Sequence, residues 1–384
     1  MKKKLIRVTT VPSSMTGLLT GQLRFMSNHY NVLGVSSKGY DNHLSELMEL
    51  EGVPSYAIEM TRQITPIQDL KALWQLYKLF KDKKPFIVHS HTPKAGTLAM
   101  VAAKFAGVPH RLHTIAGLPL LEATGIKRFI LNTVEKITYG CASKIYPNSF
   151  GLYDIILEHK FTSKHKLKVL ANGSSNGIDT THFSPNHFND HFKKELKNKF
   201  NITEEDSVFV FVGRLVKDKG INELVAAFTK LNVAYKTTKL MLIGDYEEDL
   251  DPLLPETLEA IQANPNIIFT GWVTDVRPYF AIANALTFPS YREGFPNVVM
   301  QAGAMELASI VTNINGCNEI IKNMESGLII PVKDEMALLN AMTYVLEHPA
   351  ETKAMGENSR QHIVSNYEQK VVWEAILREY DSLT

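Results

Sequence analysis

Short apolar segments alternate with amphipathic segments along nearly the whole chain of 384 residues. In the first half, apolar stretches such as LIRVTTV and FIVHSH are separated by helical patterns such as TPIQDLKALWQLYKLFKDKK. The second half repeats the arrangement with SVFVFVGRL, KLMLIGD and ALTFPS. Strands that alternate with helices form parallel sheets covered on both faces. We therefore predict an α/β protein with two doubly wound, Rossmann-like domains.

A segment without strand character separates the two series. It reads GIDTTHFSPNHFNDHFKKELKNKFNITEED and is rich in His, Asn, Lys and Phe. We expect an N-terminal domain over residues 1–180, a linker near residues 179–190, and a C-terminal domain over residues 191–367. The tail, residues 368–384, has the apolar face of a helix and is expected to pack back on the first domain.

Charge and cysteine content exclude several classes of protein. The formal net charge is +1, so the molecule carries no strong field for nucleic acid. Cys141 and Cys317 are the only cysteines, which excludes a disulfide framework and favours a reducing cytoplasm. No segment approaches the roughly 20 apolar residues of a membrane span. We interpret the start, MKKKLIRVTTV, as a first strand behind a basic leader rather than a signal peptide.

Charged residues follow the first strand of the second half. In open parallel sheets, ligands bind beyond the carboxyl ends of the strands. Gly213 lets backbone come close to a ligand, and Arg214 and Lys219 lie before a helix at Ile221. A guanidinium and an ammonium beside a helix N-terminus suit a diphosphate. A solvated basic turn is the alternative interpretation.

The next strand ends at Gly244, where a nucleoside could pass close to the backbone. An acidic run follows, with Asp249 and Asp251 in a D-x-D spacing. Such a spacing holds a metal–diphosphate complex in other folds. Here it lies within a longer acidic loop, so we interpret it as a solvated approach to a helix and predict no metal.

The segment SYREGFPNVVM contains a tight turn before a small-residue helix. Asn297 suits a helix N-cap, and the first free amides, near Val298 and Val299, would attract phosphate. Glu293 can accept hydrogen bonds from sugar hydroxyls, and Gln301, one turn into the helix, can bind another polyol such as a ribose. The alternative is that Glu293 pairs with Arg292 or caps a helix.

The first half offers weaker candidates. His89 and His91 share one face at the end of FIVHSH, and His91, nearer the carboxyl end, is the better functional candidate. A hydrogen-bonded structural histidine is the alternative, and two histidines without a third ligand are weak evidence for zinc. Lys94 follows this strand, and Gly17 lies in a first loop that we interpret as a weak phosphate or acceptor loop.

An apolar and basic stretch, GLPLLEATGIKRFILNTVEKITYG, follows the strand RLHTIAG. Lys127, Arg128 and Lys136 would meet anionic lipid while apolar neighbours enter the headgroup region. These neighbours are Leu118, Leu120, Leu121, Ile126, Phe129 and Ile130. The alternative is an ordinary helix packed on the sheet.

Taken together, these motifs resemble family-4 retaining glycosyltransferases of the GT-B fold, in the subgroup that builds capsule and O-antigen polysaccharides. The resemblance runs through nearly the whole chain and is carried by FIVHSHTPKAG, FVFVGRLVKDKGINEL, IIFTGWVTDVRPYF and FPSYREGFPNVVMQAGAM, among others. It implies two Rossmann-like domains that face each other across a cleft.

The resemblance also implies roles for individual residues. Arg214 and Lys219 would hold the donor diphosphate, and Glu293 would contact hydroxyls of the donor sugar. The residues implied to contact the base or to shape the sugar and phosphate pocket are Trp272, Val273, Gly294, Phe295, Pro296 and Asn297. The family's second glutamate is replaced here by Gln301. Many relatives have a histidine where this chain has Ala116.

The implied activity is retaining transfer of a hexose or N-acetylhexosamine from a UDP-sugar to a polyprenyl-diphosphate-linked saccharide. No cofactor or metal is expected, and the protein is expected in the cytoplasm at the inner face of the membrane. One alternative is a GT-B nucleotide-sugar 2-epimerase. Another is a non-catalytic sugar-nucleotide-binding protein, which Ala116 and Gln301 motivate.

Overall fold

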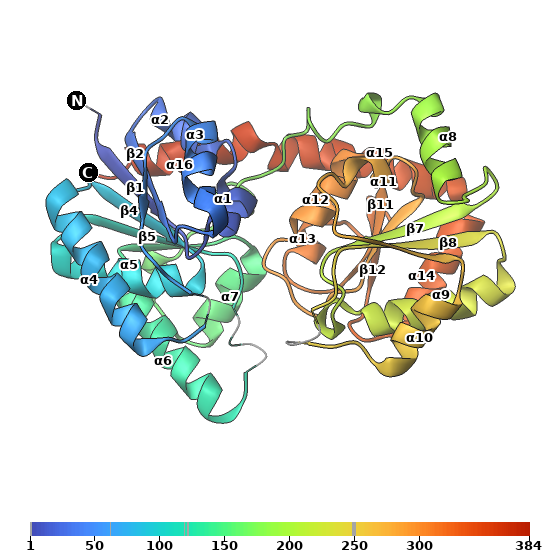
Figure 1. Cartoon of the computed structure of the whole chain (residues 1–384), viewed down its shortest axis with the longest axis horizontal. Helices are drawn as coiled ribbons and strands as arrows, with labels where there is room; N and C mark the ends of the chain where they lie inside the picture. The colour runs from blue at the N-terminus through green and yellow to red at the C-terminus, as the bar shows by residue number, and fades with distance from the viewer. Residues whose placement is uncertain (1, 62, 119, 121–122, 248–250) are drawn as a thin grey trace. The chain divides into compact units, whose positions relative to one another are not determined.

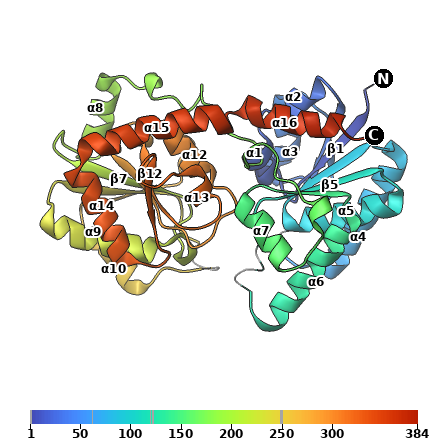
Figure 2. The ribbon, with the colours of Figure 1, turned by 180° about the vertical axis from the view of Figure 1, so that it is seen from behind.

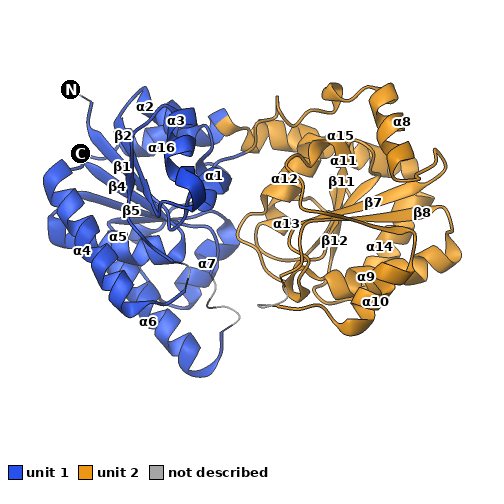
Figure 3. Cartoon of the chain, viewed as in Figure 1, with its two compact units in different colours: residues 1–177, 370–384 blue, residues 178–369 orange. Residues whose placement is uncertain are grey.

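The chain divides into two compact units in the computed structural model, which describes residues 2–61, 63–118, 120, 123–247 and 251–384. Unit 1 comprises Met1–Gly177 and Lys370–Thr384, and unit 2 comprises Ile178–Gln369 (Figure 3). Residues 178–180, which the sequence analysis assigned to the first domain, therefore belong to unit 2. The return of the chain to unit 1 begins at Lys370.

Unit 1 is built on a six-stranded parallel sheet with the order β3-β2-β1-β4-β5-β6 (Figure 1). The strands are β1 (Lys4–Val8), β2 (Asn31–Ser36), β3 (Ser55–Ala57), β4 (Ile87–His91), β5 (His110–Ile115) and β6 (Lys144–Pro147). Strands β1 and β4 are buried almost throughout. This burial on both faces explains why they read as continuous apolar runs instead of alternating ones.

Helices cover both faces of this sheet. One face carries α1 (Pro12–Leu19), α2 (Gln22–Ser27), α3 (His43–Glu51) and the C-terminal α16 (Gln369–Asp381) (Figure 2). The other carries α4 (Pro66–Lys83), α5 (Pro93–Ala106), α6 (Gly125–Cys141) and α7 (Phe150–Glu158). Neighbouring strand residues separate accordingly, since Leu5 packs with the first group and Ile6 with the second.

Unit 2 repeats the topology with the order β12-β11-β10-β7-β8-β9. Its strands are β7 (Ser207–Val212), β8 (Thr238–Ile243), β9 (Ile267–Gly271), β10 (Ala285–Phe288), β11 (Ala308–Thr312) and β12 (Gly327–Ile330). Its helices are α8 (Asp190–Lys199), α9 (Ile221–Ala234), α10 (Pro255–Ala263), α11 (Arg277–Phe280), α12 (Asn297–Ala304), α13 (Cys317–Ile320), α14 (Glu335–Glu347) and α15 (Pro349–Tyr367). They enclose one continuous apolar core.

The strand order reverses direction at one place in each sheet. In unit 1 this switch point lies between β1 and β4, and in unit 2 it lies between β7 and β10. Loops that leave two neighbouring strands in opposite directions open a crevice at the carboxyl edge, and ligands of doubly wound sheets bind there. In unit 2 the loops at this point are the two that carry Lys219 and Glu293.

Candidate active site

The loops that follow β7 and β10 abut at Gly220 and Pro289. Gly220 has a φ of +71°, and a Cβ at this position would lie 2.2 Å from the carbonyl oxygen of Pro289. Any larger residue would be strained and would push the loops apart. Just before Gly220, a single turn of 3₁₀-helix, η5 (Lys217–Lys219), places Lys219 at the start of α9.

Lys219 and Glu293 form an ion pair across these loops. Their side chains are only 14% and 16% exposed, so water screens the contact weakly. Glu293 also accepts a hydrogen bond of 3.0 Å from Ser290 Oγ, and its backbone carbonyl accepts one from the side chain of Asn315. The fold thus joins two residues that the sequence analysis selected from motifs far apart in the chain.

Arg292 does not pair with Glu293, which was the alternative open from the sequence. Its Nη2 lies 2.8 Å from Asp218 Oδ2 instead. The backbone of the two loops is joined at the same place, because the Tyr291 amide donates to the Asp218 carbonyl at 2.8 Å. Glu293 is therefore held by Lys219, while its neighbour is held by a different carboxylate.

Arg214 lies at the end of β7, and its side chain is about half exposed. It forms an ion pair with Glu247 on the loop after β8. At the base of this loop, a Cβ on Gly244 would lie 1.9 Å from the carbonyl oxygen of Gly213, so the two strand ends touch through backbone alone. Glycine is thus required at 244 by this close approach, and the predicted passage of a nucleoside beside Gly244 stays a prediction.

The segment after β9 carries Trp272 and Val273. The Trp272 side chain is 68% exposed, and its amide donates to Asp245 Oδ1 at 3.1 Å. Val273 is partly buried against the core of unit 2. The indole is thus exposed beside the carboxyl edge, and its contact with a base stays a prediction.

The N-terminus of α12 differs from its prediction in detail. Pro296 occupies the N-cap and Asn297 is the first helical residue, so the prediction that Asn297 caps the helix is wrong by one position. The amide of Val299 donates to the Pro296 carbonyl at 3.2 Å and is not free. Val298 and Gln301 are both partly buried in the first turns.

The residues between Glu293 and α12 are largely interior. Gly294, Phe295 and Pro296 are buried. The Phe295 ring packs on Tyr367, with centroids 5.2 Å apart. Phe295 therefore fixes the loop to the core and does not itself line an open pocket.

His89 and His91 lie in a buried polar network around Arg7. Arg7 is fully buried and donates to His91 Nε2 at 2.9 Å, to Gln22 Oε1 at 2.6 Å and to the Tyr380 hydroxyl at 3.1 Å. His89 Nδ1 lies 2.5 Å from the same hydroxyl. Tyr380 belongs to α16, so this network ties the C-terminal helix to the sheet.

Burial, reinforced by the charge of Arg7, holds the pKa of His89 and of His91 well below the usual value. Both rings are therefore neutral at pH 7. His91 is 1% exposed, so it has no surface at which to meet reacting atoms, and the catalytic role predicted for it lacks geometric support. The structure favours the alternative, a hydrogen-bonded structural histidine.

The other candidates of the first half are dispersed. Gly17 lies inside α1 rather than in a loop, so the interpretation of its segment as a loop is wrong. Lys94 Nζ pairs with Asp69 at 2.7 Å. Lys127 is exposed on α6, whereas Arg128 donates to the Leu120 carbonyl at 2.5 Å. Leu121, which was predicted to enter the lipid headgroup region, lies outside the described residues.

The D-x-D run is also only partly described, since Asp249 lies outside the described residues. Asp251 Oδ2 accepts the amide of Asp218 at 2.7 Å, which makes it a support for the lysine loop. Within the described ranges, no group of three or more His, Cys, Asp or Glu side chains is arranged to hold a metal ion.

Comparison with known proteins decides the family. The model for glycosyl transferases group 1 matches residues 192–362, and the model for the glycosyl transferase 4-like family matches residues 18–149. The capsular polysaccharide biosynthesis glycosyltransferase CapM of Staphylococcus aureus is 32% identical over 382 residues, which cover 99% of this chain and 97% of CapM. The chain is a glycosyltransferase of this family.

A second relative and a solved structure are also similar to this chain. An Escherichia coli enzyme described as UDP-Gal:alpha-D-GlcNAc-diphosphoundecaprenol alpha-1,3-galactosyltransferase is 29% identical over 80% of this glycosyltransferase and 78% of its own length. The crystal structure of Anabaena HepE with UDP matches with a TM-score of 0.81 at 15% identity, over 99% of this chain and 100% of that one. The glycosyltransferase therefore has the two-domain GT-B fold, as the sequence analysis predicted.

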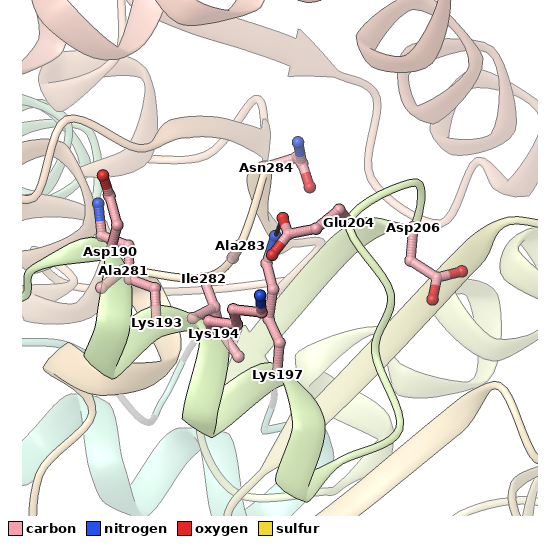
Figure 4. A pocket seen from close by; sticks show the side chains of 10 residues that line it. All are labelled: Asp190, Lys193, Lys194, Lys197, Glu204, Asp206, Ala281, Ile282, Ala283 and Asn284. Carbon is pink, nitrogen blue, oxygen red and sulfur yellow. Dashed lines mark hydrogen bonds and ion pairs between the residues drawn. The ribbon is translucent and has the colours of Figure 1, made fainter.

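A hollow in unit 2 of the glycosyltransferase lies away from these loops. It has a volume of about 330 Å³ and is lined mainly by lysines of α8 and by residues 281–284 (Figure 4). Asn284 holds the amide of Val208 at the amino end of β7, so this hollow is at the opposite edge of the sheet. Lys197 already pairs with Glu204 at 2.8 Å. Its position and charge balance give no reason to expect a ligand.

Sequence reasoning missed the residues that support the candidate site. Asp218, Ser290 and Asn315 contact the two loops through side chains or backbone, yet none of them stood out in the sequence. No local pattern identifies the contacts of Asp218 and Asn315, because their partners lie some 70 residues away for Asp218 and about 20 for Asn315. Ser290 lies only three positions before its partner Glu293, so a local turn pattern could have identified it.

Proposed function

We propose that this glycosyltransferase moves a hexose or an N-acetylhexosamine from a UDP-sugar to a polyprenyl-diphosphate-linked saccharide in bacterial surface polysaccharide synthesis, with retention at the anomeric carbon. The observation that carries the proposal is the contact between Lys219 and Glu293 at the switch point of unit 2. The similarity to CapM supports the pathway, and the similarity to the galactosyltransferase that acts on a diphosphoundecaprenol-linked sugar supports the lipid-linked acceptor.

The donor diphosphate would bind beside Lys219 and Arg214. An ammonium has three donor hydrogens, so Lys219 can hold Glu293 and a phosphate oxygen together. Arg214 is bound only to Glu247 in the described structure, on a half-exposed side chain that can turn toward an anion. The N-terminus of α12 adds the partial positive charge of the helix dipole in the same region.

Glu293 would accept hydrogen bonds from hydroxyls of the donor sugar. Because Lys219 neutralises it, the carboxylate can sit close to the diphosphate without repelling it strongly. Gln301, one turn into α12, would hydrogen-bond the ribose through its amide oxygen, and the exposed face of Trp272 with Val273 would contact the base.

Transfer would then depend on charge stabilisation at the leaving group. The bond between the anomeric carbon and the diphosphate oxygen breaks, and the acceptor hydroxyl attacks on the same face. Its proton passes to a phosphate oxygen of the departing UDP. Lys219, Arg214 and the helix end stabilise the charge that develops there, so we propose that no metal is needed.

Unit 1 offers a surface suited to the membrane in which a polyprenyl acceptor resides. Helices α4, α5 and α6 pack side by side on one face of the sheet. Their outward apolar side chains are Ile67, Leu70, Trp74, Phe105, Ile126, Phe129, Ile130 and Ile137. A groove of about 450 Å³ between α4 and α5 is lined by Leu70, Leu73, Trp74, Tyr77, Ala102 and Phe105. We call this the α4–α6 face.

Lysines surround the α4–α6 face. Lys71, Lys78, Lys81, Lys104, Lys127 and Lys136 are all exposed, and Lys78 Nζ lies 5.2 Å from the centroid of the Trp74 ring. Apolar and aromatic side chains flanked by lysines are the composition of helices that lie in an anionic membrane interface. We therefore place the peripheral contact, at the cytoplasmic leaflet, on the α4–α6 face. Within the described ranges, no helix is long and apolar enough to cross a bilayer.

The test is incubation with a panel of UDP-sugars and a polyprenyl-diphosphate disaccharide, followed by mass spectrometry of the lipid and assay of free UDP. We expect UDP release that depends on the acceptor, together with a mass increase of one sugar. Isomerised donor without transfer would support a 2-epimerase, and binding without turnover would support a non-catalytic protein. Either result would overturn the proposal.

A further inference from the structure

Asp218 connects three segments of unit 2. Its amide donates to Asp251 Oδ2 at 2.7 Å, and its carbonyl accepts the amide of Tyr291 at 2.8 Å. Its carboxylate accepts a hydrogen bond from Arg292 Nη2 at 2.8 Å. One residue therefore joins the loops that follow β7, β8 and β10, directly beside Lys219.

The charges on the two facing loops are arranged in complementary order. Asp218 and Lys219 are consecutive on one loop, and Arg292 and Glu293 are consecutive on the other. Asp218 pairs with Arg292, and Lys219 pairs with Glu293. A shift of one residue in this register would place like charges together, which is unfavourable at partly buried sites.

We propose that Asp218 is a positioning residue, which binds Arg292 so that Lys219 and Glu293 keep the register needed for the reaction. The inference rests on the proposed function, in which those two residues contact the donor. The pairing of Asp218 with Arg292 also determines which of the two cations, Arg292 or Lys219, contacts Glu293 and the donor. Arg292 is occupied by Asp218 and is kept from replacing Lys219 at Glu293.

The Asp218 side chain is 19% exposed and that of Arg292 is 38% exposed. Removing one partner of such a pair leaves the other charge without compensation. In Asp218→Asn, Arg292 would be free to bind the neighbouring Glu293 or the diphosphate. Either new contact of Arg292 would move the Glu293 carboxylate. A displacement of about 1 Å of such a group can lower the reaction rate about 100-fold.

The first experiment compares Asp218→Asn with the wild-type enzyme in the acceptor-dependent assay. The substitution keeps the shape of the side chain and the backbone bonds of Asp218. We expect kcat to fall at least about tenfold while the KM for the donor changes less than about threefold, since positioning acts mainly on the transition state. An unchanged kcat, or a loss confined to KM, would overturn the inference.

A double-mutant cycle separates positioning from general damage. Arg292→Gln should lower kcat as Asp218→Asn does, and the double variant should be no worse than the poorer single variant. Arg292→Lys, which keeps a cation, should recover part of kcat. Losses that multiply in the double variant would show independent roles and contradict the inference.

The matched control is the pair of Lys230 on α9 and Glu335 on α14, with Nζ and Oε1 2.7 Å apart. Lys230→Gln removes an ion pair of the same unit that lies near the C-terminal end of α9, whereas Lys219 precedes the N-terminus of that helix, and kcat should stay within about twofold. Lys219→Ala distinguishes a failure of the positioning inference from a failure of the proposed function. If it abolishes transfer while Asp218→Asn is neutral, only the positioning inference fails. If Lys219→Ala is neutral as well, the proposed function fails.

Discussion

The two units share one strand order but differ at the carboxyl edges of their sheets. In unit 2 the loops after β7 and β10 face each other with two complementary ion pairs, Asp218–Arg292 and Lys219–Glu293, and are held together at Gly220 and Asp218. Behind the corresponding edge of unit 1 lies a fully buried Arg7, whose acceptors are all neutral. The same topology therefore supports two different charge arrangements. Among the described residues, the two complementary ion pairs lie at the edge of unit 2, where we propose that the diphosphate binds.

The difference teaches that topology locates a crevice but does not supply its chemistry. In unit 1 a buried cation with neutral partners anchors α16 through Tyr380, and burial raises the pKa of this tyrosine to about 12. In unit 2 the cations meet carboxylates within reach of solvent.

Acid should destabilise unit 1 more than unit 2. Burial lowers the pKa of His113 to about 4 and that of His89 and His91 in the same direction. The unfolded chain then binds more protons below pH 6.5, so stability is present above that pH and is lost as the pH falls toward the folded pKa. Between pH 6.5 and 5, His113 alone should cost about 2 kcal/mol.

Hydrogen exchange followed by mass spectrometry at a series of pH values would check this, because it reports on each unit separately. The amides of β1, β4 and β5 should lose protection before those of β7 and β8. In unit 2 the comparable group is His362, only half buried, whose pKa is lowered too. Equal loss of amide protection in both units would contradict the prediction that acid destabilises unit 1 more than unit 2.

Lys219→Ala should reduce kcat/KM by about 100-fold or more, which corresponds to about 2.7 kcal/mol of transition-state stabilisation. The lysine is expected to hold the leaving diphosphate and also to neutralise Glu293. Acceptor-dependent UDP release measures the effect, and Lys230→Ala serves as the control. If Lys219→Ala kept activity within about twofold of the wild type, the reaction would not take place at the carboxyl edge of unit 2 as proposed.

Replacing Trp74 should weaken binding to anionic vesicles by about tenfold, since burial of a large aromatic side chain contributes about 1.5 kcal/mol or more. Co-sedimentation with phosphatidylglycerol vesicles measures this, and phosphatidylcholine vesicles provide the uncharged reference. Exposed Trp272 in unit 2 is the matched control, and Trp272→Ala should leave vesicle binding unchanged.

Two results would contradict the assignment of the α4–α6 face to a membrane. One is unchanged vesicle binding after Trp74→Ala. The other is a difference in molar mass, measured by light scattering, between Trp74→Ala and the wild type. Such a difference would identify the face as an interface between copies of the chain. A charge-reversed variant, Lys78→Glu, should weaken vesicle binding most at low salt.

Gln301→Glu should have the smallest effect, with donor affinity unchanged or improved by up to about threefold, less than 1 kcal/mol. A carboxylate accepts hydrogen bonds from ribose hydroxyls more strongly than an amide oxygen does. Calorimetric titration with UDP measures the change. Loss of binding by a folded variant would show that this turn of α12 faces something other than ribose.

The sequence analysis anticipated much of the fold from local patterns. The buried parallel strands appeared as continuous apolar runs, and both sheets follow from their alternation with helices. Lys219 and Glu293 were selected from separate motifs because each follows a strand end. Gly17 was misplaced because its segment, PSSMTGLLTG, contains two glycines and two serines, yet α1 forms there against the sheet.

His91 shows where local reasoning fails. Its position near the carboxyl end of β4 suggested a functional side chain. Burial is set by α2 and by α16, which returns from the far end of the chain to place Tyr380 beside His89 and Arg7. Nothing near residue 91 records that contact.

The sequence by itself determined the parallel α/β architecture, the family and the motif that bears each candidate side chain. These follow from hydrophobic periodicity and from residue chemistry, which act over a few positions. Only the tertiary structure decided which charges meet. Arg292 pairs with Asp218, and Glu293 with Lys219, because the strand order brings together two loops that are more than 70 residues apart. Electrostatic interactions depend on distance in space, and the strand order sets that distance.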